Sequence, residues 1–132
     1  MKKLVATLVL SAMAVAAPTA GMAVSVTYAH GNGTQNATQW YGNGAYLDGV
    51  LRSAAGSPVY YEGLVAIGNC SDVNDGRYTG NVTSTSYMGA GGQVTSGPLF
   101  WPCYLQGAKA RVCRDINNLP DTCGGWSALI PR

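Results

Sequence analysis

The chain has 132 residues, of which only 11% are charged, and its 8 basic and 6 acidic residues give a formal net charge of +2. So few charges exclude the strongly basic surface on which binding to nucleic acid depends. The length suits one domain with a modest hydrophobic core. We therefore predict a single folded domain with no nucleic-acid partner.

The first residues are typical of a secretory signal peptide. Met1 and two lysines precede an apolar run of about 14 residues and a small-residue exit that ends at Ala23. The run is shorter than the ~20 residues that a membrane-spanning helix needs. We predict a signal peptide over residues 1–23 and a mature domain over residues 24–132, secreted by a bacterium to its periplasm or to the outside.

Loss of the signal peptide changes the charge of the protein. Both leading lysines leave with it, so that residues 24–132 keep six charges of each sign and are formally neutral. A neutral domain lacks the basic patch that draws proteins to anionic lipids. We therefore expect no membrane insertion after cleavage, and the candidate partners are a glycan or another protein.

The mature chain begins with a predicted strand and a predicted loop. Residues 24–29 alternate apolar and polar side chains, which predicts a β-strand. Residues 30–39, HGNGTQNATQ, are polar and rich in glycine, so we expect a flexible loop. Within residues 45–55, Leu47 and Leu51 have helical spacing, which makes this stretch the only candidate helix.

Before the candidate helix, the string Tyr41-Gly42-Asn43-Gly44 resembles the head of the pediocin-like (class IIa) bacteriocins. That family continues with a valine and a closely spaced cysteine pair, and its members are short and cationic. Here Ala45 and Tyr46 follow, the first cysteine is Cys70, and the mature chain is long and neutral. We interpret the string as a tight turn in which Asn43 and its glycines accept positive φ.

Further segments rich in Val, Thr and Tyr indicate strands up to the end of the chain. Their bounds are 58–67, 77–88 (as one strand or two), 92–97, 99–105, 108–113 and 125–130. Gly63 is a candidate bulge, and Asn74-Asp75-Gly76 predicts a hairpin turn. Together the pattern predicts an all-β fold, an antiparallel β-sandwich or small β-barrel of about six or seven short strands.

The mature domain contains all four cysteines, Cys70, Cys103, Cys113 and Cys123, and an even number in an exported chain predicts two disulfides. Four cysteines allow three pairings, and we favour Cys70–Cys103 with Cys113–Cys123. The alternation in residues 108–113 places Cys113 on the polar face, so its bridge should pin the outer side of a hairpin. The spacing lacks the C-x-x-C pair of zinc sites, and we predict no metal and no cofactor.

Candidate catalytic groups are few. His30 is the only histidine, and no G-x-S-x-G elbow is present to expose a nucleophilic serine. Glu62 lies between aromatic residues of a predicted strand, where it either faces solvent or, if buried, acts as a general acid with a raised pKa. We predict no catalytic residue, with a small glycan hydrolase that uses Glu62 as an alternative.

Aromatic side chains are the best remaining indication of binding. We select the three residues that flank the predicted turn as candidate ligand-binding residues: Trp40, Tyr41 and Tyr46. A second aromatic group surrounds Cys103 and consists of Phe100, Trp101 and Tyr104. Exposed rings bind sugars or proteins, although a chain with one phenylalanine also needs Trp and Tyr in its core.

These observations favour a secreted, non-enzymatic binding module or cell-surface component. An antibacterial or toxin-like secreted protein is an alternative of a different class, beside the hydrolase.

Overall fold

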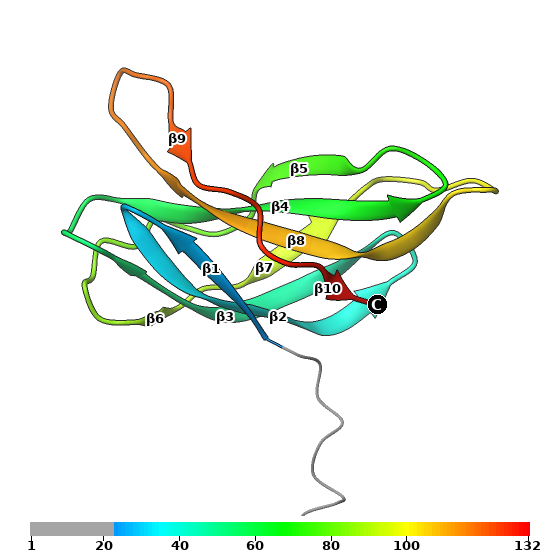
Figure 1. Ribbon diagram of the computed structural model, residues 1–132, viewed down its shortest axis with the longest axis horizontal. Helices are drawn as coiled ribbons and strands as arrows, with labels where there is room; N and C mark the ends of the chain where they lie inside the picture. Colours follow the sequence, from blue (N-terminus) through cyan, green and yellow to red (C-terminus); the bar gives the residue numbers. More distant parts are fainter. Residues whose placement is uncertain (1–22) are drawn as a thin grey trace, which may run out of the picture.

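The computed structural model describes residues 23–132 and shows two antiparallel β-sheets packed face to face (Figure 1). In sheet A the order is β1-β2-β3, and both β6 and β7 pair with the free side of β3. In sheet B the order is β10-β8-β4-β5, and β9 also pairs with β8. The predicted all-β sandwich is confirmed. The predicted signal peptide lies outside the described residues except for Ala23.

Seven of the ten strands are longer than two residues, which agrees with the predicted number. The strands of sheet A are β1 (Val24–Tyr28), β2 (Gly31–Tyr41), β3 (Gly44–Ser53), β6 (Met88–Gly89) and β7 (Gly92–Thr95). The strands of sheet B are β4 (Val59–Gly68), β5 (Val73–Arg77), β8 (Tyr104–Arg114), β9 (Thr122–Cys123) and β10 (Ile130–Pro131). Residues 23–132 contain no helix that could span a membrane.

The core lies between the two sheets and follows the alternation of each long strand. In β8, Ala108, Ala110 and Val112 are fully buried and face sheet A, as the period-2 pattern predicts. Leu47 and Leu51 of β3 meet them from the other side. The alternation therefore sets which face of each strand is left for solvent or a ligand.

The flexible loop predicted over residues 30–39 is wrong, because this segment forms most of β2. Its inward positions carry Gly31, Gly33, Gln35 and Ala37, all buried. Three of these four residues are glycine or alanine, and at Gly33 the reason is lack of space: a Cβ there would overlap the hydroxyl of Tyr61. Glycine here serves close packing between sheets and not flexibility.

The polar residue in this row, Gln35, is buried with its hydrogen bonds made. Its Nε2 donates to the carbonyl oxygen of Ala90 at 2.9 Å, and its Oε1 accepts from the Tyr78 hydroxyl at 2.7 Å. Burial raises the pKa of Tyr78 well above its usual range, so this phenol stays protonated and continues to donate. Because its hydrogen bonds are made, Gln35 can occupy a core position, although a polar residue does not suggest one in the sequence.

The candidate helix over residues 45–55 is also wrong. Nearly all of it belongs to β3, which pairs with β2 from Tyr41↔Gly44 to Gly31↔Ser53. Leu47 and Leu51 are four residues apart, a spacing that both a helix face and a strand face accommodate. This segment forms a strand because β3 pairs with β2 on one side and with β6 and β7 on the other.

The strand predicted over residues 77–88 is largely absent. The chain crosses here from sheet B to sheet A and keeps one isolated bridge, Val59↔Val82, before the short β6. At the crossing, the ring of Tyr78 stacks on Tyr61 with 6.1 Å between centroids. Likewise, the segments predicted at 99–105 and 125–130 are strand only near their C-terminal ends.

The bulge predicted at Gly63 lies in the partner strand, because the β4–β5 register passes from Gly63↔Gly76 to Leu64↔Asn74 and leaves Asp75 of β5 unpaired. The hairpin turn predicted at Asn74-Asp75-Gly76 is wrong in place, since these residues lie inside β5. Gly76 has φ of +83° and donates its N–H to Asn74 Oδ1 at 2.9 Å. The positive φ of Gly76 therefore belongs to the bulge in β5. The turn between β4 and β5 lies at residues 69–72.

Candidate functional site

One end of the sandwich carries a loop of exposed aromatic side chains. Residues 96–104, named here the aromatic loop, connect β7 of sheet A to β8 of sheet B. The loop, drawn in yellow, reaches beyond the rest of the sandwich at the right of Figure 1. Trp101 is 93% exposed and Phe100 is 75% exposed, and Tyr104 at the start of β8 is also exposed. Trp101 and Phe100 are the two most exposed aromatic residues in residues 23–132.

The foot of the aromatic loop is held to the core. The disulfide Cys70–Cys103 joins it to the turn after β4, with the two Cα atoms 5.4 Å apart. Leu99 packs against the core cluster from inside, as does Cys103. The N–H of Cys103 donates to the carbonyl oxygen of Phe100 at 2.8 Å, which closes a turn around Trp101 and a cis proline. The two exposed rings therefore stand on a constrained backbone.

The turn at Gly42-Asn43 supports the start of the same loop. The Asn43 carbonyl oxygen accepts from the N–H of Ser96 at 2.8 Å, and its Nδ2 donates to the Gly97 carbonyl oxygen at 3.1 Å. The predicted tight turn is confirmed as a two-residue connection between β2 and β3. The predicted positive φ is wrong: Gly44 is needed because a Cβ there would overlap the Val94 carbonyl.

The three selected aromatics do not lie together on one face. Trp40 is half-buried against the core cluster, and Tyr41 follows it in the strand and so points to the opposite side. Tyr46 is 40% exposed on the outer face of sheet A, where its neighbours across the strands are Gln39 and Gln93. A ligand-binding role for these residues stays a prediction.

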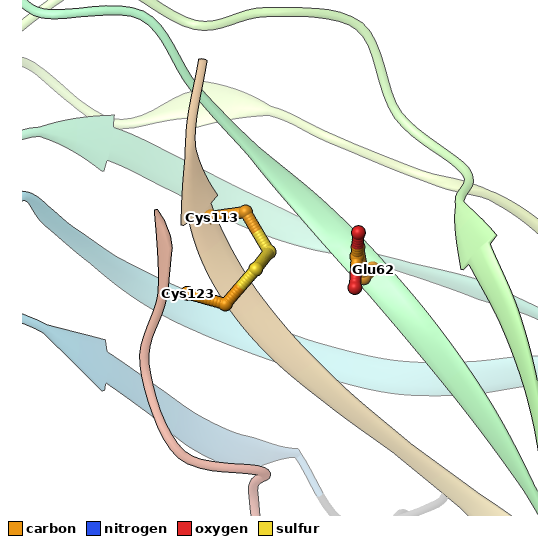
Figure 2. Close-up of side chains that lie close together, drawn as sticks. All are labelled: Glu62, Cys113 and Cys123. Carbon is orange, nitrogen blue, oxygen red and sulfur yellow. A yellow bond between two sulfur atoms is a disulfide. The ribbon is translucent and has the colours of Figure 1, made fainter. Parts of the chain in front are cut away.

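Glu62 lies on the outer face of sheet B beside the second disulfide (Figure 2). Its Oε1 accepts from Arg111 Nη2 at 2.7 Å and from Arg111 Nε at 3.0 Å. The guanidinium of Arg111 also lies over the ring of Trp126, 4.3 Å from its centroid. Because one arginine occupies the carboxylate and a ring covers the arginine, the arrangement is that of a structural ion pair.

Glu62, Cys113 and Cys123 are close enough together to share a metal ion. Figure 2 shows the two sulfur atoms joined to each other, so neither can supply the thiolate that metal binding requires. The grouping is therefore a disulfide with a neighbouring carboxylate. Both predicted pairings, Cys70–Cys103 and Cys113–Cys123, are confirmed.

Cys113 lies on the outer face of β8, as the alternation predicts, and yet is fully buried. The chain after β9 folds back over this face and explains the burial. Gly124 donates its N–H to the Val112 carbonyl oxygen at 2.9 Å, and Ser127 donates to the Ala110 carbonyl oxygen at 2.8 Å. The bridge to Cys123 therefore pins a covering segment to the sheet.

His30 lies in the turn between β1 and β2, with its ring 5.1 Å from that of Tyr28 in an edge-on arrangement. Within residues 23–132, no hydrogen bond joins its imidazole to a serine or a carboxylate. The geometry that activates a serine nucleophile is not assembled around this histidine.

A polar network surrounds Tyr60 on the outer face of sheet B. The Tyr60 hydroxyl donates to Asp121 Oδ2 at 2.7 Å, and Arg77 lies over the phenol ring at 4.3 Å. Burial raises the pKa of Tyr60, and the bond to Asp121 raises it further. The N–H of Ile116 and the Tyr60 hydroxyl together hold the pKa of Asp121 below its usual range. The network ties the loop before β9 to the sheet.

The lowered pKa of Asp121 predicts a pH dependence of stability. A depressed pKa in the folded state means that stability is present above the unfolded pKa and is lost as the pH falls below about 4. The stability curve of Asp121→Asn should therefore lie below that of the wild type at neutral pH and converge with it in acid. Urea titrations at several pH values measure this. Parallel curves would refute the assignment.

Comparison with known proteins adds no relative. No protein-family model matches the chain, and neither the curated proteins nor the solved structures yield a significant match. The fold and the site define a small β-sandwich with two disulfides and one exposed, disulfide-anchored aromatic loop.

Proposed function

We propose that this protein is a secreted, non-enzymatic binding module whose target contact is the aromatic loop. The observation that carries the proposal is the exposure of Trp101, at 93%, on a loop with a constrained foot. Aromatic anchors on preorganised surfaces dominate the energy of many protein contacts.

The exposure of the two rings is not required by the fold. Phe100 is the only phenylalanine of the chain, and the core uses Tyr61 and Tyr78 instead. An aromatic side chain removes 150–250 Å² from water on burial, at about 25 cal/mol per Å², so covering Phe100 and Trp101 would contribute several kcal/mol. Binding to a target that covers both rings would therefore gain this free energy, which folding alone leaves unused.

The held backbone of the loop favours binding in a second way. A flexible segment loses conformational entropy when it is ordered on a target, and this loss weakens association. Here Leu99 and Cys103 already pack against the core. The rings can therefore meet a target with little further ordering.

The compartment is consistent with this role. Two disulfides and no free cysteine in residues 23–132 fit an oxidising environment outside the cytoplasm. Together with the signal peptide predicted from the sequence, they support secretion.

A second exposed apolar group provides a matched comparison. Tyr87 and Met88 are 55% and 50% exposed, and Met88 lines a shallow groove of about 260 Å³. The Tyr87 hydroxyl donates to Asn32 at 3.0 Å and Arg52 lies over its ring, so this ring is already engaged. The aromatic loop has no such internal partners for Phe100 and Trp101 among the described residues.

The test compares two double variants on a panel of bacterial cells, animal cells, immobilised glycans and extracellular proteins. We expect Phe100→Ala/Trp101→Ala to bind its target at least about tenfold more weakly, because truncating central aromatic anchors typically costs more than 1 kcal/mol each. Its melting temperature should stay close to that of the wild type. The control, Tyr87→Ala/Met88→Ala, should bind normally.

Three results would contradict the proposed function: unchanged binding by the loop variant, loss in the control alone, or no target for the wild-type protein on any surface.

A further inference from the structure

The tip of the aromatic loop has no polar side chain apart from the single indole N–H of Trp101. The five consecutive residues at the tip are Pro98, Leu99, Phe100, Trp101 and Pro102. A sugar site combines an aromatic platform with several convergent polar side chains that bind the hydroxyl groups. The tip offers no such set, so its chemistry fits an apolar acceptor better than a glycan.

Polar groups appear only at the base of the tip. The Nδ2 of Asn69 donates to the Pro102 carbonyl oxygen at 3.3 Å, and the Ser96 hydroxyl donates to the Asn43 carbonyl oxygen at 3.1 Å. Tyr104 is exposed beside them, and its ring lies where a Cβ on Gly68 would be. Apolar rings at the tip with a tyrosine and amides behind them match the gradient of polarity across a bilayer interface.

The tip projects from the end of the molecule (Figure 1), and no charged residue lies in residues 96–104. A projecting apolar loop can enter a lipid bilayer directly. Binding a small ligand would instead need a shaped cavity in the protein. Desolvating it costs no buried charge, because none is present.

We propose that the aromatic loop anchors the protein reversibly to lipid bilayers by placing Phe100 and Trp101 in the interfacial region. The inference rests on the proposed function and names a lipid surface as its target. The mature chain is neutral and the loop is uncharged, so zwitterionic lipid suffices and anionic lipid adds little. The expectation of no membrane insertion rested on charge and on spanning length, and shallow burial of two rings needs neither.

Affinity should be modest and insensitive to salt. Even a single myristoyl chain gives an association constant of only about 10⁴ M⁻¹, and two rings are of comparable size. Ionic strength screens charge–charge attraction and leaves apolar burial largely unaffected.

The experiment uses the oxidised mature protein and vesicles of phosphatidylcholine. We expect the wild type to co-sediment with vesicles, Phe100→Ser/Trp101→Ser to lose at least about tenfold in partitioning, and Tyr87→Ser/Met88→Ser to partition like the wild type. Adding phosphatidylserine or raising the salt from about 0.1 M to about 1 M should change partitioning by less than about twofold.

Lipids brominated near the headgroup locate the contact. They should quench tryptophan emission of the wild type, whereas Trp101→Phe should keep most of the partitioning and lose the quenching. Retained quenching in Trp101→Phe would place Trp40 or Trp126 in the bilayer and overturn the inference.

Absent partitioning of the wild type, equal partitioning of the loop variant, or strict dependence on phosphatidylserine would also overturn it. If the loop variant at the same time loses binding to a glycan or protein from the panel, the proposed binding module stands and only the lipid target falls.

Discussion

Replacing Gly33 by alanine should lower the free energy of unfolding by about 3 kcal/mol, because the new methyl group has no room. A Cβ on Gly33 would overlap the Val50 carbonyl oxygen and the Tyr61 hydroxyl. That hydroxyl donates to the same carbonyl at 2.6 Å, so neither atom can move without losing this partly buried hydrogen bond. Denaturant unfolding of the oxidised protein measures the loss.

Gly42→Ala is the matched control for this prediction. A Cβ on Gly42 meets nothing within 4 Å, and its φ lies outside the left-handed region. Its free energy of unfolding should therefore stay within about 0.5 kcal/mol of the wild type. Equal effects of Gly33→Ala and Gly42→Ala would show that residues 30–39 are not packed between the sheets.

Removing the Cys70–Cys103 bridge should cost about 3–4 kcal/mol, more than removing Cys113–Cys123, at about 2–3 kcal/mol. The first bridge closes a separation of 33 residues and the second only 10, and the unfolded chain gains more freedom from the longer loop. Serine double variants compared by denaturant unfolding measure both losses. A greater loss for the shorter loop would contradict this order.

The same two variants separate stability from the binding role of the loop. Cys70 and Cys103 fix the foot of the aromatic loop, whereas Cys113 and Cys123 pin the covering segment on the outer face of sheet B. Under conditions in which both variants remain folded, only Cys70→Ser/Cys103→Ser should weaken target binding. If the two variants bind the target equally, the Cys70–Cys103 disulfide does not contribute to binding by the aromatic loop.

The two long strands of sheet B, β4 and β8, could be predicted from the sequence, and β8 has a clear alternation of apolar and polar residues. Ala108, Ala110 and Val112 identify the inner face of β8 and place Cys113 on the outer one. The pairing of the cysteines was a preference among three possibilities, and the alternation then placed the Cys113 bridge on the outer side of the sheet. Local patterns were sufficient wherever one face of a strand is apolar.

Sheet A was harder because its longest strand buries glycine and glutamine. The space for Gly33 is set by Tyr61, and the bonds of Gln35 are set by Tyr78 and Ala90, all distant in sequence. Polarity and glycine content therefore indicated a loop at residues 30–39. Buried positions of this kind can be identified only from a structure that shows the facing sheet.

The candidate site was recognised only in outline. Both aromatic groups were noted, yet exposure depends on which rings the core takes, and the core takes Tyr61 and Tyr78 while it leaves Phe100 outside. Hydrophobicity alone would have buried the only phenylalanine. Alternation along β2 also separates Trp40 from Tyr41, a consequence of strand geometry that a turn motif does not reveal.

Fluorine NMR of protein labelled with 5-fluorotryptophan shows directly whether the aromatic loop contacts the target, because the chain has three tryptophans in different surroundings. Trp40 packs against the core, Trp126 lies against Arg111, and Trp101 is free in solvent. On addition of the bound surface, the Trp101 signal should shift or broaden while the other two stay in place. A change at Trp40 or Trp126 with Trp101 unaffected would contradict the aromatic loop as the contact.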